Sequence, residues 1–148
     1  MEITNEKLSI GDLMTTHPIC AFPNMIMTEV AEIFEENSFH HIPVIDEDDM
    51  CIGVISESDY LQLQDKFTKF GAGRCAKGNK RFFASLLAKE VMSPFPQSVE
   101  IDDSITKVLD IFMKNKVHSV VVNENEKFRG IITTYDIIEW LSSEINLT

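Results

Sequence analysis

One short motif with chemically useful residues occurs twice in this chain. It reads Gly-Val-Ile-Ser-Glu-Ser-Asp at 53–59 and Gly-Ile-Ile-Thr-Thr-Tyr-Asp at 130–136. In both copies a glycine and two apolar residues precede Ser or Thr, and an aspartate follows three positions later. A strand that runs into a helix at this point would present backbone N–H groups to an anion. The aspartate could accept hydrogen bonds from a pair of sugar hydroxyls.

The motif also has a purely structural interpretation. Ser or Thr followed three residues later by Asp, ahead of an apolar helix, is the pattern of a capping box. Ser56 and Thr133 would then accept hydrogen bonds from backbone N–H groups at the start of a helix. The two interpretations are compatible, because Ser56 or Thr133 can cap while Asp59 or Asp136 faces a ribose.

Both motifs lie at the same place in an internal repeat, in which residues 10–64 align with residues 88–141. The offset is 78 residues and drops to 77 after a one-residue gap near Asp48. Twelve positions are identical, where chance would give about three. Each copy predicts a leading strand, a helix, two strands and a second helix, in that order.

Apolar spacing predicts an amphipathic helix in each copy, because residues at i, i+3, i+4 and i+7 share one helix face. The residues with this spacing are Met27, Val30, Ala31 and Phe34 in the first copy and Ile105, Val108, Leu109 and Phe112 in the second. Asn24 and Asp102 are the predicted N-caps. A single β-α-β-β-α unit of this size is marginally stable, so we expect the two copies to pack together with pseudo-twofold symmetry and a cleft between them.

Composition and charge narrow the class of protein. The 148 residues are 44% hydrophobic and 25% charged, which is typical of a globular chain. The net charge of −11 opposes binding to nucleic acid or to an anionic membrane, so neither is an expected partner. No apolar run reaches the ~18 residues that span a bilayer, and the amino terminus lacks the pattern of a signal peptide. These features predict a cytoplasmic protein.

The segment between the copies is basic and contains three of the six glycines. Residues 64–87 hold six basic residues and one acid, and they predict a connector with a flexible centre. Its bases either face solvent or reach a bound anion or an acidic partner.

Catalysis and metal binding are not expected from the histidines and cysteines. His40 and His41 are adjacent on a predicted strand and point to opposite faces, so they cannot easily share a metal. The three cysteines have no C-x-x-C spacing. The chain also has no G-x-S-x-G, H-E-x-x-H or G-x-x-x-x-G-K-[ST] motif.

With its repeated motifs, the sequence resembles the cystathionine-β-synthase (CBS) domain pair, which is a regulatory module. The resemblance rests on the doubled 53–59 and 130–136 motif, on His-Ile-Pro-Val-Ile-Asp at 41–46, and on Leu13-Met14 and Val91-Met92 in the leading segments. It implies an α+β fold of tandem CBS domains, with CBS domain 1 at 8–64, the connector at 65–85 and CBS domain 2 at 86–145.

The resemblance also implies roles for individual residues. Asp59 and Asp136 would hold a ribose. The residues near a phosphate would be Ser56, Thr133, His40, His41 and His118. The residues bordering the adenine in the cleft would be Cys20, Ala21, Ser98, Val99, Ile42, Pro43 and Val120. Leading strands of the family often contain Thr-Val, and the second copy is closer to this pattern, so its signature is slightly favoured as a competent site.

These roles predict a non-enzymatic module that binds an adenosine compound, namely AMP, ADP, ATP or S-adenosylmethionine. Ligand binding would change the shape or assembly state of a homodimer and pass energy status to an unidentified protein target. The alternative is a ligand-free module for dimerisation or protein interaction through the acidic first copy. A DNA-binding regulator is disfavoured, because the only basic cluster is interrupted by glycines and fits a major groove poorly.

Overall fold

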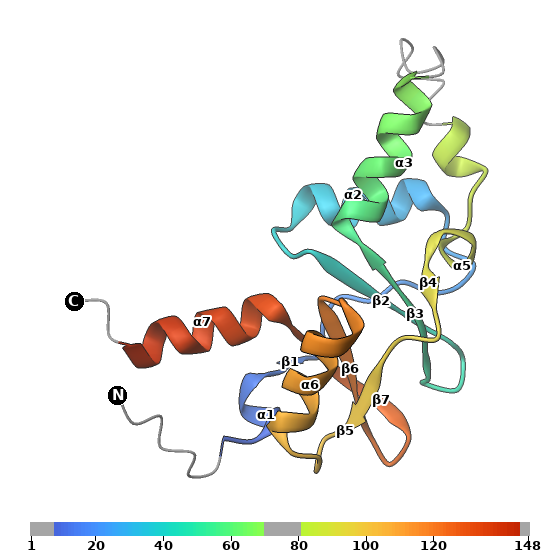
Figure 1. Cartoon of the computed structure of the whole chain (residues 1–148). Coiled ribbons are helices and arrows are strands. Elements are labelled where there is room, and N and C mark those ends of the chain that lie inside the picture. Colours follow the sequence, from blue (N-terminus) through green and yellow to red (C-terminus); the bar gives the residue numbers. More distant parts are fainter. Residues whose placement is uncertain (1–7, 70–80, 146–148) are drawn as a thin grey trace. The chain divides into compact units, whose positions relative to one another are not determined.

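The computed structural model describes residues 8–69 and 81–145, except for the side chains of 66–69 (Figure 1). The glycine-rich centre of the predicted connector lies outside the described residues. The chain forms two compact units. The first-repeat unit is Ile19–Phe95, and the second-repeat unit combines Met1–Pro18 with Pro96–Thr148.

The first-repeat unit contains a three-stranded antiparallel sheet with the order β2-β3-β4. A parallel bridge between Ala21 and Val44 adds the leading segment beside β2. The elements of this unit are α2 (Met27–Glu36), β2 (His41–Ile45), β3 (Cys51–Ser56), α3 (Glu57–Lys69), α5 (Ala88–Val91) and β4 (Ser93–Pro94).

The second-repeat unit contains a four-stranded sheet with the order β1-β7-β6-β5. The β5–β6 pair is parallel and the other two pairs are antiparallel. The elements of this unit are α1 (Ile10–Leu13), β1 (Thr15–Thr16), β5 (Ser98–Glu100), α6 (Ile105–Asn115), β6 (Ser119–Glu124), β7 (Lys127–Thr133) and α7 (Thr134–Ile145). The chain therefore adopts the predicted α+β fold, with two repeats of the same kind.

Each unit has its own apolar core, built on the helix face that the sequence predicts. The four predicted positions of α2 are all buried, and Phe34 stacks on Tyr60 of α3 with ring centroids 5.5 Å apart. Phe83, which follows the undescribed residues, is buried in the same core. In α6 the prediction is wrong at Leu109, which is 37% exposed. It lies at the edge of the apolar stripe, where i+4 spacing rotates the side chain toward solvent.

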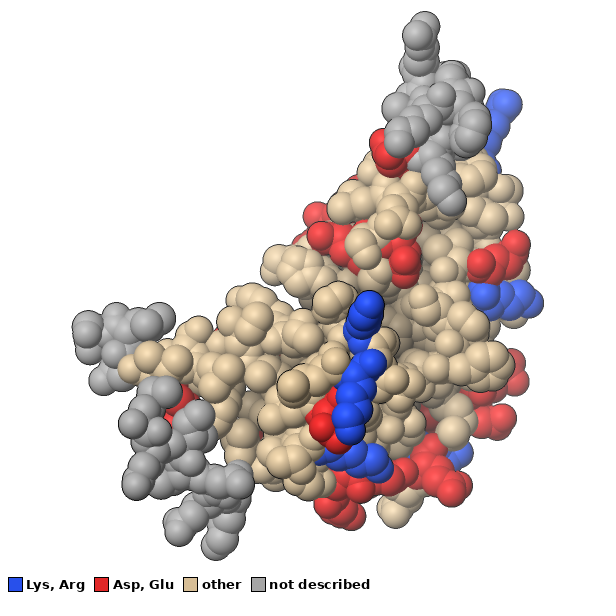
Figure 2. Space-filling view, viewed as in Figure 1, with Lys and Arg blue, Asp and Glu red and all other residues tan. Residues whose placement is uncertain are grey.

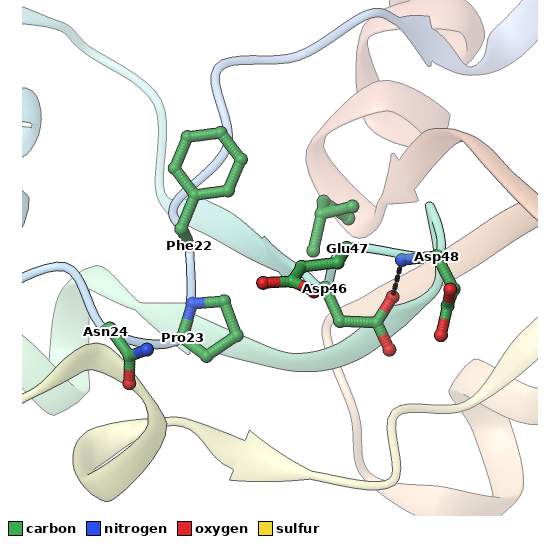
Figure 3. Close-up of a pocket in the computed structure, with 7 residues that line it drawn as sticks. Phe22, Pro23, Asn24, Asp46, Glu47 and Asp48 are labelled. Atoms are coloured by element: carbon green, nitrogen blue, oxygen red, sulfur yellow. Dashed lines mark hydrogen bonds between the residues drawn. The ribbon is translucent and has the colours of Figure 1, made fainter.

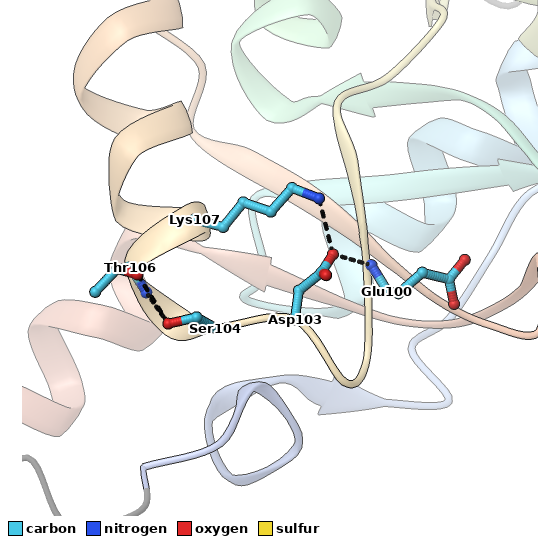
Figure 4. Close-up of polar contacts among 5 residues, drawn as sticks. All are labelled: Glu100, Asp103, Ser104, Thr106 and Lys107. Atoms are coloured by element: carbon cyan, nitrogen blue, oxygen red, sulfur yellow. Dashed lines mark hydrogen bonds and ion pairs between the residues drawn. The ribbon is translucent and has the colours of Figure 1, made fainter.

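The predicted N-caps are also wrong, because both helices begin later than the sequence suggested. The N-cap of α2 is Ile26, which has no side-chain cap, and the N-cap of α6 is Ser104, whose hydroxyl accepts a hydrogen bond from the Thr106 backbone N–H at 3.3 Å. The aspartate that makes hydrogen bonds near the start of α6 is Asp103 and not Asp102. Asp103 accepts from the Glu100 backbone N–H at 2.8 Å and pairs with Lys107 at 3.0 Å (Figure 4).

The short segments that lead into the repeats pair outside their own repeat. β1, in the leading segment of the first repeat, pairs with β7 of the second, and β4, in the leading segment of the second repeat, pairs with β3 of the first. This exchange explains the repeated glycine. A Cβ at Gly130 would lie 2.5 Å from the Thr15 backbone oxygen, and a Cβ at Gly53 would meet the side chain of Met92. Glycine is therefore needed where each leading segment crosses a strand closely.

Charge is distributed differently over the two equivalent helices. α2 carries four glutamates and no basic residue, whereas α6 carries Lys107 and Lys114 with one acid, and Lys116 caps its end. Figure 2 shows basic side chains gathered around α6. Within the described residues, no helix is long and apolar enough to cross a membrane.

Candidate functional site

The first copy of the motif, hereafter the signature, lies where β3 ends and α3 begins. The backbone N–H of Ser56 donates to Asp59 Oδ2 at 3.3 Å, and the backbone N–H of Asp59 donates to Ser56 Oγ at 3.1 Å. These reciprocal hydrogen bonds form a capping box. The structural interpretation of the first signature is therefore confirmed.

The second signature has the same geometry at the junction of β7 and α7. Thr133 N–H donates to Asp136 Oδ2 at 2.8 Å, and Asp136 N–H donates to Thr133 Oγ1 at 3.2 Å. Burial raises the pKa of Asp136 above its ordinary value, although hydrogen bonds from Thr133 oppose the shift. Capping leaves the second carboxylate oxygen, Oδ1, with acceptor capacity in both aspartates.

The predicted histidines lie beside the signatures. The His40 carbonyl oxygen accepts from the Glu57 N–H at 2.8 Å, and the His118 carbonyl oxygen accepts from the Thr134 N–H at 3.0 Å. These matching bonds make the two positions equivalent. His41 faces Ser56 in the β2–β3 register, just as Ser119 faces Thr133 in the other unit.

Glu57 is a further residue within the first signature, which the sequence analysis did not single out. Its Oε1 lies 3.5 Å from His40 Nδ1, next to Ser56. The signal was present in the sequence, because Glu57 occupies the position directly after Ser56 where the second signature has Thr134. Glu57 was not singled out, because the motif has no required residue type at this position.

The predicted adenine-bordering residues are spread along the sheets. Ile42 and Val120 lie one residue from the His41–Ser56 and Ser119–Thr133 pairs, whereas Ala21 bridges Val44 further along β2. Ala21 N–H donates to the Pro43 carbonyl oxygen at 2.8 Å, and Ser98 lies opposite Val121 in the parallel β5–β6 pair. The side chains of Ile42 and Val120 are fully buried in the cores. Ile42 and Val120 can therefore border a ligand only through their backbone.

Hollows open on the surface of the first-repeat unit. One, of about 320 Å³, is lined by Asp59 of the signature together with Gln62, Leu63, Phe82, Leu86, Glu90 and Val91. A larger one, of about 480 Å³, lies between Phe22 and the acidic turn at Asp46 and contains no signature residue (Figure 3). The smaller hollow is the one that contains the carboxylate of a signature, and its volume falls at the lower end of the usual ligand-pocket range.

The described cysteines are poor nucleophiles. Burial raises the pKa of the Cys20 and Cys51 thiols to about 11. Neither forms a disulfide. No group of three metal-ligating side chains occurs within residues 8–65 and 81–145.

Comparison with known proteins identifies the family. The family model for the CBS domain matches residues 10–66 and 88–143, which are most of the chain. The chain belongs to the CBS domain family, as a pair of CBS repeats.

Several known proteins are similar over almost the whole chain. Protein MJ1225 of Methanocaldococcus jannaschii is 27% identical over 93% of this chain, which corresponds to 49% of the relative. Its crystal structure, described as that of a proposed archaeal homolog of g-AMPK, gives a TM-score of 0.74. The chain spans about half the length, or less, of the first curated relatives it matches.

Two further solved structures share the fold and hold adenosine compounds. CBSX2 in complex with AMP is 20% identical, with a TM-score of 0.73 over 95% of this chain and 100% of that chain. The CBS domain pair of MJ0100, in complex with 5′-methylthioadenosine and S-adenosyl-L-methionine, is 20% identical, with a TM-score of 0.67 over 90% of this chain and 99% of that chain.

Proposed function

We propose that this chain is a non-enzymatic regulatory module that binds adenosine-containing compounds at its two signatures. The observation that carries the proposal is that Asp59 and Asp136 use only one of their two carboxylate oxygens in the capping box. Each aspartate is held by a backbone N–H through Oδ2, and Oδ1 keeps the capacity to accept from ribose hydroxyls. A carboxylate fixed in this way needs little reorganisation when a ligand binds.

The relatives support the class of ligand. CBSX2 binds AMP, and the MJ0100 pair binds 5′-methylthioadenosine and S-adenosylmethionine, so adenosine is the part that these compounds share. For this chain, the adenosine would lie against the backbone of the leading strand, with its ribose at Asp59 or Asp136. ADP and ATP belong to the same proposed class.

The absence of catalysis is part of the proposal. The Cys20 and Cys51 thiols are almost fully protonated at neutral pH, because their pKa is about 11. The signature hydroxyls accept cap hydrogen bonds from backbone N–H groups, and the Oδ2 atoms of Asp59 and Asp136 accept from backbone N–H groups of the same boxes. Binding would act by favouring one of two arrangements of the protein, for which the ligand must have unequal affinities.

Thermal melting with a panel of nucleotides tests the proposal. A ligand present at 100 times its dissociation constant adds ~2.7 kcal/mol, which raises the melting temperature of a chain of this size by several degrees. We expect AMP, ADP, ATP, 5′-methylthioadenosine or S-adenosylmethionine to produce this shift, and guanosine monophosphate to serve as the control. The absence of a shift with every adenosine compound at millimolar concentration would refute the proposal.

The second candidate is a ligand-free dimerisation module, which the surface of α7 favours. No residue of α7 is buried, and Tyr135, Ile138 and Ile145 are 59%, 59% and 47% exposed. Apolar side chains of this size on one helix are typical of a contact surface, and the predicted occupant is a second copy of the chain. A concentration-dependent dimer in sedimentation, combined with no nucleotide shift, would favour this candidate over the first.

A further inference from the structure

The two signatures differ in charge at one structurally equivalent position. Glu57 and Thr134 are each the first residue of their helix, and each donates its backbone N–H to the carbonyl oxygen of the preceding histidine position, at 2.8 and 3.0 Å. The backbone is therefore the same at both positions. The side chain is a carboxylate in the first-repeat unit and a neutral hydroxyl in the second.

The Glu57 carboxylate lies among the residues expected near a phosphate. Its Oε1 is 3.5 Å from His40 Nδ1, and Glu57 directly follows Ser56. Ser56 Oγ is already engaged, since it accepts from Asp59 N–H at 3.1 Å and contacts Ser58 Oγ at 3.0 Å. A 5′-phosphate entering here would meet a negative charge and a histidine that is paired with that charge.

The surrounding helices reinforce this difference. The first-repeat helix α2 carries Glu29, Glu32, Glu35 and Glu36, and the hollow beside Asp59 is also lined by Glu90. The second-repeat helix α6 ends at Lys116 and carries Lys107 and Lys114, which pair with Asp103 and Asp110 and so balance those acids, while Glu139 is the acidic neighbour of Asp136. Summed charges of one sign change the local concentration of a charged ligand, so a phosphate is disfavoured at the first signature relative to the second.

We propose that Glu57 makes the first-repeat site select adenosine compounds with an uncharged or cationic 5′ group, and that Thr134 leaves the second-repeat site able to accept a 5′-phosphate. The inference rests on the proposed function, because it assumes that both signatures bind adenosine. It assigns different ligands to the two sites, so one chain could respond to a nucleotide and to a sulfonium or thioether nucleoside.

The size of the effect follows from the charges. A phosphate monoester carries a charge of about −1.5 to −2 at neutral pH. Its repulsion by a carboxylate at about 5 Å in largely aqueous surroundings corresponds to roughly tenfold in affinity. 5′-Methylthioadenosine has no 5′ charge and should be insensitive to Glu57.

The experiment measures AMP and 5′-methylthioadenosine binding by calorimetry on the full chain, one site at a time. Asp136→Asn isolates the first-repeat site, and Asp59→Asn isolates the second. In the Asp136→Asn background, Glu57→Thr should raise the affinity for AMP by about tenfold and change that for 5′-methylthioadenosine by less than about twofold. In the Asp59→Asn background, Thr134→Glu should lower AMP affinity by a similar factor. Glu57→Gln keeps the size of the side chain and should act like Glu57→Thr.

Glu47→Thr is the matched control, because it removes one negative charge from the acidic turn of the same unit without touching the signature. A response to Glu47→Thr as large as the response to Glu57→Thr would overturn the inference, as would equal changes for both ligands or a first-repeat site that already prefers AMP. If both compounds bind the unmodified chain but Glu57→Thr has no effect, the charge inference fails and the proposed function stands. If neither binds, the proposed function itself fails.

Discussion

Asp136 should have two separable roles, as the N3 partner of Thr133 in the capping box of α7 and as a ligand-binding carboxylate. Replacing it with alanine removes the acceptor for the Thr133 N–H, a hydrogen bond of 2.8 Å at a half-buried position. Loss of such a cap costs about 1 kcal/mol, within a range of roughly 0.5–2. For a chain of about 150 residues this lowers the melting temperature by roughly 2–4 °C without unfolding the protein.

Asp136→Asn should behave differently, because the amide oxygen of asparagine can still accept the Thr133 N–H at the N3 position of the capping box. It keeps an oxygen for the Thr133 N–H and removes a charge that is partly desolvated. Burial raises the folded-state pKa of Asp136, so ionisation of this group makes the folded state less stable than a neutral side chain would. This penalty is fully present above the folded-state pKa and disappears as the pH falls through that pKa toward the unfolded value of about 3.9. The stability of Asp136→Asn relative to the wild type should therefore be highest at neutral pH and decline in acid.

Urea unfolding at pH values from 4 to 7, with and without AMP, measures both roles. Glu144→Gln is the control, because it removes an exposed charge from the same helix. Both Asp136 variants should lose AMP-induced stabilisation at the second-repeat site, whereas Glu144→Gln should retain it. An Asp136→Ala variant as stable as the wild type would refute the capping argument. A relative stability of Asp136→Asn that increases as the pH falls would refute the burial argument.

Two further results are expected. Gly130→Ala should destabilise the protein by about 1–3 kcal/mol, because its Cβ would be forced against the Thr15 backbone oxygen. Gly53→Ala should be less destabilising, because its Cβ meets the flexible side chain of Met92. Chemical denaturation that ranks the two variants in the opposite order would contradict the strand-crossing argument. Cys20 and Cys51 should react with iodoacetamide about two orders of magnitude more slowly than free cysteine at pH 7.5, since a pKa of about 11 leaves little thiolate. Rapid modification of either thiol in peptide mass mapping would show that the thiol is not buried as described.

The repeated order of elements and the apolar faces of the helices were predictable from the sequence. Periodicity reports which side of a helix faces a core, and the buried positions of α2 agree with it. Helix starts were less predictable. The Asn24 and Asp102 side chains are good caps, but the first turn began at Met27 and Ile105, where tertiary packing of the apolar face decides the boundary.

The exchange of β1 and β4 could not be predicted from local patterns. A two-residue strand such as Thr15–Thr16 carries no detectable periodicity, and its partner β7 lies more than a hundred residues away. The identity of Gly53 with Gly130 and of Met14 with Met92 was visible in the repeat, but its cause is the crossing of strands in space. Glu57 was overlooked for a similar reason, because only the β2–α3 geometry brings it to His40.

The crossed leading segments also limit where the chain can be cut into fragments that fold on their own. A fragment cut at the repeat boundary would carry β3 without β4, and it would leave the core contacts of Ala88 and Met92 unfilled. An isolated repeat could complete its sheet only by taking the missing piece from another molecule, so we expect single-repeat fragments to assemble as intertwined oligomers. With two repeats in one polypeptide, each repeat receives the missing strand from the other repeat of the same chain, and no second molecule is needed.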